Sequence, residues 1–152
     1  EMDRRGLTGV DIRNREIRRE KASRADLTLR IDTYQTDATT EHFLSFETAG
    51  ERIAGFLRLS LPQHDQDHPL PELQGHAMIR EVHVYGPALD LGEENQGEAQ
   101  HMGLGSELIA KAKEISREAG YGRLAVISAI GTRTYYERHG FQMDGHYMTA
   151  TL

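Results

Sequence analysis

The chain contains no cysteine, and this absence excludes several kinds of site at once. Disulfides, thiolate nucleophiles, cysteine-based zinc sites and iron–sulfur clusters all require the missing thiol. No apolar run approaches the roughly 20 residues that cross a bilayer, and no signal-peptide pattern opens the sequence. These absences predict a cytoplasmic, globular protein without a membrane partner.

The 152 residues are 38% hydrophobic and 28% charged, as expected for one domain with a substantial core. The first residue is Glu1 rather than methionine, so we expect the chain to be part of a longer polypeptide. Residues 1–30 hold nine Lys and Arg against six Asp and Glu, whereas the remainder holds nine against eighteen. We therefore predict a basic linker over residues 1–25 and a domain over residues 26–152.

Six basic residues crowd between Arg13 and Arg24, a pattern typical of polyanion contacts. A solvated basic helix explains the same pattern, so both interpretations stay open.

Six segments have the alternation or the apolar run typical of β-strands. They are residues 26–34, 41–47, 52–61, 75–85, 124–130 and 146–152. Residues 124–130 are nearly continuous in apolar side chains, as in a central strand covered on both faces. In the strand over residues 75–85, alternation places Ile79, Glu81 and His83 on one face.

Two helices are expected between these strands. An apolar stripe from Leu104 to Ala119 predicts an amphipathic helix that Gly120 ends. A short helix is predicted over residues 132–139, and residues 91–99 are expected to form an acidic loop. The order strand, helix, strand predicts an α/β fold with a mixed sheet, in which ligands bind at the carboxyl ends of the strands.

The segment Gln100-His-Met-Gly-Leu-Gly-Ser106 opens the predicted long helix. Backbone N–H groups in the first turn of a helix lack intrahelical partners and attract anions. Gly103 and Gly105 would let a phosphate approach the backbone closely. The Gly-Lys-Ser/Thr of a nucleotide-binding P-loop does not follow, and the third glycine of a dinucleotide-binding motif is missing. The segment therefore predicts a pyrophosphate-binding turn that differs from both of those motifs.

Together with Tyr135-Tyr-Glu-Arg-His-Gly-Phe141 downstream, this turn resembles the acetyl-CoA pyrophosphate motif of the GNAT acetyltransferases. The resemblance implies that the strands flanking the helix splay apart and that pantetheine bonds to the free edge of the earlier one. The implied acetyl-CoA contacts are Glu81, Val82, His83, Val84, Gln100, Gly103, Leu104, Gly105, Ser106, Glu107 and Tyr136.

Five blocks resemble the Elongator catalytic-subunit family more specifically: residues 80–86, 103–105, 125–128, 131–136 and 145–148. This resemblance implies a domain that hydrolyses acetyl-CoA and supplies the acetyl group for modification of the wobble uridine of tRNA at C5. The family joins it to a radical S-adenosylmethionine domain with a Cys-ligated 4Fe–4S cluster. Because this chain has no cysteine, we expect that partner domain and its cofactors only outside it. If tRNA is the polyanion that the basic cluster contacts, the candidate contacts are Arg13, Arg15, Arg18, Arg19 and Lys21.

Four residues are candidates for catalysis. A carboxylate in a buried strand should have a raised pKa, which favours Glu81 as a general base or water-orienting group. A salt bridge from Glu81 to Arg80 or Arg133 is the alternative, and His83 is a second candidate base. Tyr136 is the preferred proton donor to the departing CoA thiolate, with Tyr135 packed inward, although the two roles could be exchanged.

His64-Asp-Gln-Asp-His68 contains residue types that bind metals. Polar loops often produce such clusters without a metal, so no metal site is predicted. Two other functions also fit the sequence. One is a conventional acetyltransferase acting on a protein lysine or a small amine, because a fold does not fix a function. The other is a non-catalytic module that binds tRNA and CoA.

Overall fold

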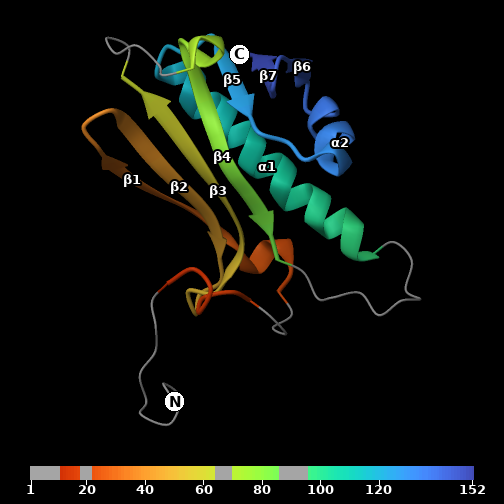
Figure 1. Cartoon of the computed structure of the whole chain (residues 1–152). Coiled ribbons are helices and arrows are strands. Elements are labelled where there is room, and N and C mark those ends of the chain that lie inside the picture. Colours follow the sequence, from red (N-terminus) through yellow and green to blue (C-terminus); the bar gives the residue numbers. More distant parts are fainter. Residues whose placement is uncertain (1–10, 18–21, 64–69, 86–95) are drawn as a thin grey trace.

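The computed structural model describes residues 11–17, 22–63, 70–85 and 96–152. These residues form a seven-stranded sheet in the order β1-β2-β3-β4-β5-β7-β6, with one long helix against it (Figure 1). The strands are β1 (Thr28–Gln35), β2 (Thr39–Glu47), β3 (Ile53–Pro62), β4 (His76–Val84), β5 (Arg123–Val126), β6 (Gln142–Asp144) and β7 (Tyr147–Thr151). The helices are α1 (Gln96–Glu118) and α2 (Arg133–Glu137), and short 3-10 turns cover Arg24–Asp26, Pro71–Leu73 and Ile130–Thr132.

The sheet is mixed, as predicted. The pairs β1–β2, β2–β3 and β3–β4 are antiparallel, the pair β4–β5 is parallel, and the pairs β5–β7 and β7–β6 are again antiparallel. Because parallel neighbours need a crossover connection, α1 lies between β4 and β5 in the sequence. This arrangement confirms the predicted α/β class with a central strand–helix–strand unit.

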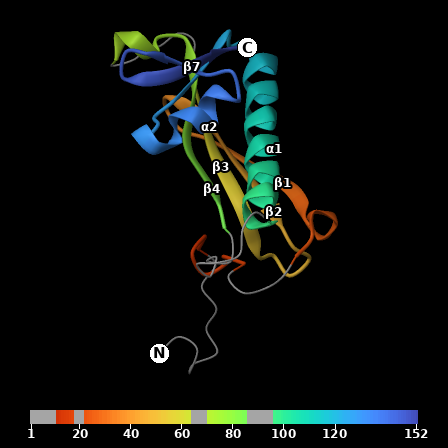
Figure 2. The same ribbon diagram turned by 90° about the vertical axis from the view of Figure 1, so that its right-hand side faces the viewer.

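The core lies between α1 and one face of the sheet (Figure 2). Leu108, Ile109 and Ala112 of α1 are at most 1% exposed, and Leu57 of β3 and Ile79 of β4 are fully buried. Burial of a side chain such as leucine or isoleucine contributes about 1.5–3 kcal/mol. Among the described residues, no helix has the length and hydrophobicity of a membrane-spanning segment.

Helix α1 begins earlier than the sequence pattern predicts. Its first residue is Gln96 rather than Leu104, so Gly103 and Gly105 lie inside the helix and the last part of the predicted acidic loop is helical. A glycine inside a helix costs only about 1 kcal/mol, which the helix formers around Gly103 offset. Since N–H groups inside a helix bond to the carbonyl four residues earlier, those of Gly103 and Gly105 do not form the expected first-turn cradle.

The predicted strand over residues 124–130 is also too long. Strand β5 ends at Val126, and Ile127 and Ile130 are 63% and 80% exposed. An apolar run predicts that its residues are buried, but it does not show where the hydrogen-bonded pairing of a strand ends. Here the pairing stops because neither β4 nor β7 continues alongside the chain after Val126.

Part of the predicted basic linker packs on the sheet. The N–H of Ile17 donates to the carbonyl of Ile53 at 3.0 Å, and the Ile17 side chain is 8% exposed within the core. The guanidinium of Arg15 donates to the Glu47 carboxylate at 2.5 Å. Residues 15–17 therefore contact the domain closely, while the boundary at residue 26 stays a prediction.

Candidate active site

Strand β4 parts from β5 halfway along its length. The parallel pairing runs from His76 opposite Arg123 to Ile79 opposite Val126, where β5 ends. Strand β4 continues to Val84, and among the described residues only β3 pairs with this second half. We call the side of residues 80–84 that faces away from β3 the open edge (Figure 1). Backbone N–H and C=O groups on such an edge need partners from outside the sheet.

A β-bulge lies where the open edge begins. Arg58 of β3 is opposite Glu81, whereas Leu59 is opposite Ile79, so Arg80 is the extra residue. A bulge bends its strand and shifts the following side chains to the opposite face. Glu81 and His83 therefore lie on the face turned away from α1, and the predicted alternation that grouped them with Ile79 is wrong.

Glu81 is not the buried carboxylate that the sequence analysis expected. Its side chain is 46% exposed and lies 3.9 Å from the guanidinium of Arg58, which replaces the expected partners Arg80 and Arg133. Arg80 instead lies 3.9 Å from the buried carboxylate of Glu41. The desolvation argument for Glu81 as a general base thus does not hold, although the residue stays at the edge of the site.

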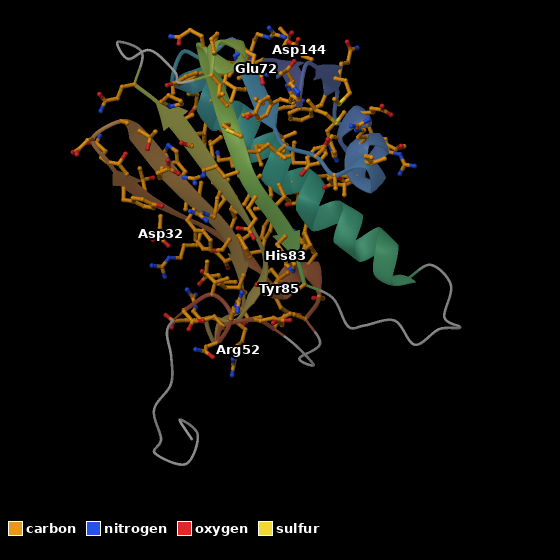
Figure 3. The ribbon with its side chains drawn as sticks, in the orientation of Figure 1. Asp32, Arg52, Glu72, His83, Tyr85 and Asp144 are labelled. Carbon is orange, nitrogen blue, oxygen red and sulfur yellow. The ribbon has the colours of Figure 1, made fainter. Side chains whose placement is uncertain are left out.

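His83 belongs to an aromatic cluster on the same face. Its ring stacks on Phe56 with centroids 5.9 Å apart and lies 4.5 Å from the ring of Tyr85 (Figure 3). Phe43 extends the cluster to β2 through a 5.4 Å contact with Phe56. Since the His83 side chain is exposed, it can reach a ligand that approaches β4 from this face.

The two tyrosines of α2 occupy different environments. Tyr136 is 8% exposed and packs edge-on against Phe141. The hydroxyl of Tyr135 lies against Gly105 of α1, so closely that a Cβ at Gly105 would collide with it. The same Cβ would lie 3.7 Å from the Val84 side chain at the end of the open edge. The geometry therefore favours Tyr135, rather than Tyr136, as the phenol that faces the open edge.

Burial raises the pKa of both phenols, and the neighbouring Tyr135 raises that of Tyr136 further. Both hydroxyls are therefore protonated at neutral pH, which is the state that a proton donor needs. Sequence reasoning missed the third ring of this group, the imidazole of His139, which contacts Tyr135 edge-on with centroids 4.9 Å apart. The four-residue spacing of Tyr135 and His139 was the signal that could have found it.

The residues of the glycine motif have separate roles. Leu104 is buried in the core, and the Ser106 hydroxyl lies 3.3 Å from Nε2 of His139. The Glu107 carboxylate receives two hydrogen bonds from Arg24, at 2.9 and 2.7 Å, so it neutralises a cation of the chain itself. The side chain of Gln100 lies outside the described residues.

The basic segment is only partly described. Arg13 is exposed, Arg15 is bonded to Glu47, and Arg24 is bonded to Glu107. The predicted tRNA contacts Arg18, Arg19 and Lys21, and the His64–His68 cluster, lie outside the described residues. In the part that is described, no group of three or more His, Asp or Glu is arranged to hold a metal.

The acetyltransferase (GNAT) family matches residues 11–141. This chain belongs to that family. It is 36% identical to Elongator complex protein 3 of Drosophila melanogaster over 97% of its own length and 28% of that protein. It is 38% identical to the tRNA uridine(34) acetyltransferase of Dehalococcoides mccartyi, over 93% of this chain and 32% of the relative.

A solved structure agrees with these relatives. The archaeal Methanocaldococcus infernus Elp3 with an N-terminal deletion superposes with a TM-score of 0.77 at 28% identity, over 99% of this chain and 37% of that one. The chain therefore spans about a third of the length of the relatives that it matches.

Proposed function

We propose that this chain is the acetyl-CoA-binding acyltransferase domain of an enzyme that modifies the wobble uridine of tRNA. The observation that carries the proposal is the open edge of β4 with the Tyr135 hydroxyl beside its end. Membership of the acetyltransferase family supports the reaction class. The name of the relative in Dehalococcoides, a tRNA uridine(34) acetyltransferase, supports tRNA as the substrate.

The open edge fits a pantetheine chain. Its two amides offer N–H and C=O groups that complement the backbone of residues 81–84, much as a neighbouring strand would. Acetyl-CoA supplies an activated thioester. We place its pyrophosphate near the N-terminal end of α1, where the helix dipole is positive, rather than at Gly103.

In the proposed hydrolysis, a water oxygen bonds to the thioester carbonyl carbon and the C–S bond breaks. Acetate and CoA form, and the departing sulfur takes up a proton. Tyr135 is the proposed donor of that proton, while His83 or Glu81 orients the attacking group from β4. Supply of the acetyl group to uridine C5 needs radical chemistry from a separate domain with S-adenosylmethionine and a 4Fe–4S cluster. The cluster ligands would come from that domain, because this chain lacks cysteine.

The proposal is tested by calorimetric titration with acetyl-CoA and CoA, followed by thioester hydrolysis with and without tRNA. We expect acetyl-CoA to bind and turnover to require tRNA. Tyr135→Phe should lower turnover about 100-fold, the lower range for loss of a general acid, with little change in affinity. Tyr136→Phe is the matched control and should retain most of the activity.

Other outcomes would contradict the proposal. Acetylation of peptides without tRNA would indicate a conventional lysine acetyltransferase. Binding of tRNA and CoA without turnover, also in the full-length protein, would indicate a non-catalytic module. A loss of activity in Tyr136→Phe alone would reverse the assignment of the two tyrosines.

A further inference from the structure

His139 connects the residues after α2 to the middle of α1. Its Nε2 lies 3.3 Å from the Ser106 hydroxyl, and its backbone carbonyl accepts a hydrogen bond from Nζ of Lys113 at 2.5 Å. Its ring contacts the ring of Tyr135 at an interplanar angle of 69°. His139 therefore contacts both α1, through Ser106 and Lys113, and the ring of Tyr135.

Helix α2 needs such contacts because it is short. It spans only Arg133–Glu137, and isolated helices of that length are unstable in water. The position of the Tyr135 hydroxyl therefore depends on what packs against its ring. The centroid of the Tyr135 ring lies 5.4 Å from that of Tyr136 and 4.9 Å from that of His139. Its hydroxyl lies against Gly105 of α1.

We propose that His139 is a positioning residue: anchored to Ser106, its ring holds the Tyr135 hydroxyl against Gly105 at the end of the open edge. The inference rests on the proposed function, in which Tyr135 donates a proton. His139 acts through Tyr135, since the polar contacts of its imidazole and its carbonyl are to α1. Ser106 thereby gains a role besides the acetyl-CoA contact that the resemblance implies.

The charge state of His139 suits this role. Burial and the nearby ammonium of Lys113 both lower the pKa of His139, so its ring is neutral at neutral pH. A neutral imidazole keeps one nitrogen for the Ser106 hydroxyl without placing a second cation beside Lys113.

The test follows the Tyr135 ring directly and does not depend on activity alone. The six tyrosines are replaced by 3-fluorotyrosine, and the Tyr135 fluorine resonance is assigned by its loss in Tyr135→Phe. The resonance is then compared in His139→Gln, Ser106→Ala and a control, His42→Gln. His42 is a matched control because its Nδ1 also lies near a hydroxyl, that of Thr33 at 2.8 Å, and burial also lowers its pKa.

We expect the Tyr135 resonance to shift or broaden in His139→Gln and Ser106→Ala but not in His42→Gln. Turnover of acetyl-CoA by the full-length enzyme should fall about tenfold or more in His139→Gln, through kcat rather than KM, because misplacement of a catalytic group by about 1 Å can cost a factor of 100. If His139→Gln unfolds the protein, Ser106→Ala alone decides.

An unchanged Tyr135 resonance in both variants would overturn the inference. So would a change in KM with kcat unaffected. Failure of the proposed function is a separate result: the wild-type protein would then not bind acetyl-CoA, while the fluorine spectra would still show whether His139 positions Tyr135.

Discussion

Replacing Gly105 by alanine tests the contact between α1 and Tyr135 that defines the candidate site. Both Gly103 and Gly105 lie inside α1, so an alanine at either position gains helix propensity. Their surroundings differ, because a Cβ at Gly103 meets nothing within 4 Å, whereas a Cβ at Gly105 collides with the Tyr135 hydroxyl. Gly103→Ala is therefore the matched control.

The two effects have opposite signs at Gly105. Alanine in place of glycine stabilises an exposed helix position by about 0.8–1 kcal/mol, which is the change expected for Gly103→Ala. Overpacking costs about 1–3 kcal/mol, so Gly105→Ala should lie about 1–3 kcal/mol below Gly103→Ala in unfolding free energy. In a chain of this size that difference corresponds to about 2–12 °C in melting temperature.

The assay is urea unfolding of both variants, each with Tyr135 and with Tyr135→Phe. Removal of the hydroxyl leaves Cζ of residue 135 at 3.5 Å from the new methyl group, an ordinary contact. Gly105→Ala should therefore become as favourable as Gly103→Ala in the Tyr135→Phe background. If Gly105→Ala stabilises the wild-type protein as much as Gly103→Ala does, the Tyr135 hydroxyl does not lie against Gly105 and the assignment of the site fails.

Two further predictions concern stability. Arg24→Ala should lower the free energy of unfolding by about 0.5–1 kcal/mol, because Arg24 pairs with Glu107 at the surface and its guanidinium covers the Phe46 ring at 4.5 Å. The loss should be smaller at high salt, and a double-mutant cycle with Glu107→Ala measures the coupling between the two charges. The folded structure lowers the pKa values of His42 and His139 from 6.5, so the unfolded chain binds more protons and the free energy of unfolding should fall as the pH drops below about 6.5. The fall should be smaller in His139→Gln. A pH profile of that variant identical to the wild-type profile would contradict the burial of His139.

Sequence patterns predicted most of the strands but not where their register changes. The strands predicted over residues 41–47 and 52–61 match β2 and β3 closely, and the two strands form the antiparallel pair that a hairpin requires. A two-residue period cannot reveal the extra residue Arg80, so the faces of Glu81 and His83 were assigned wrongly. Strand β6 was missed because all three of its residues are exposed, so no apolar side chain packs into the core to mark it.

The candidate site was predicted in part. The glycine motif and the tyrosine pair do lie together, since Gly105 meets Tyr135, although both glycines are inside the helix. The sequence favoured Tyr136 over Tyr135 without a geometric reason, because adjacent residues on a helix point in directions that only tertiary contacts select. Those contacts come from Phe141 and His139, which lie beyond the end of α2.

The open edge raises a physical question, because unpaired strand edges invite pairing with other chains. Its first residues, Arg80 and Glu81, are charged and lie at a bulge, two features that discourage a foreign strand. At its other end, α1 lies close to the edge, because a Cβ at Gly105 would lie 3.7 Å from the Val84 side chain. Tyr135 stands near the same end, on the side of α1. A full strand has side chains on both faces and would meet the charged residues at one end and α1 with Tyr135 at the other. An unbranched amide chain would meet fewer of these groups, which is the structural basis for expecting pantetheine at the edge.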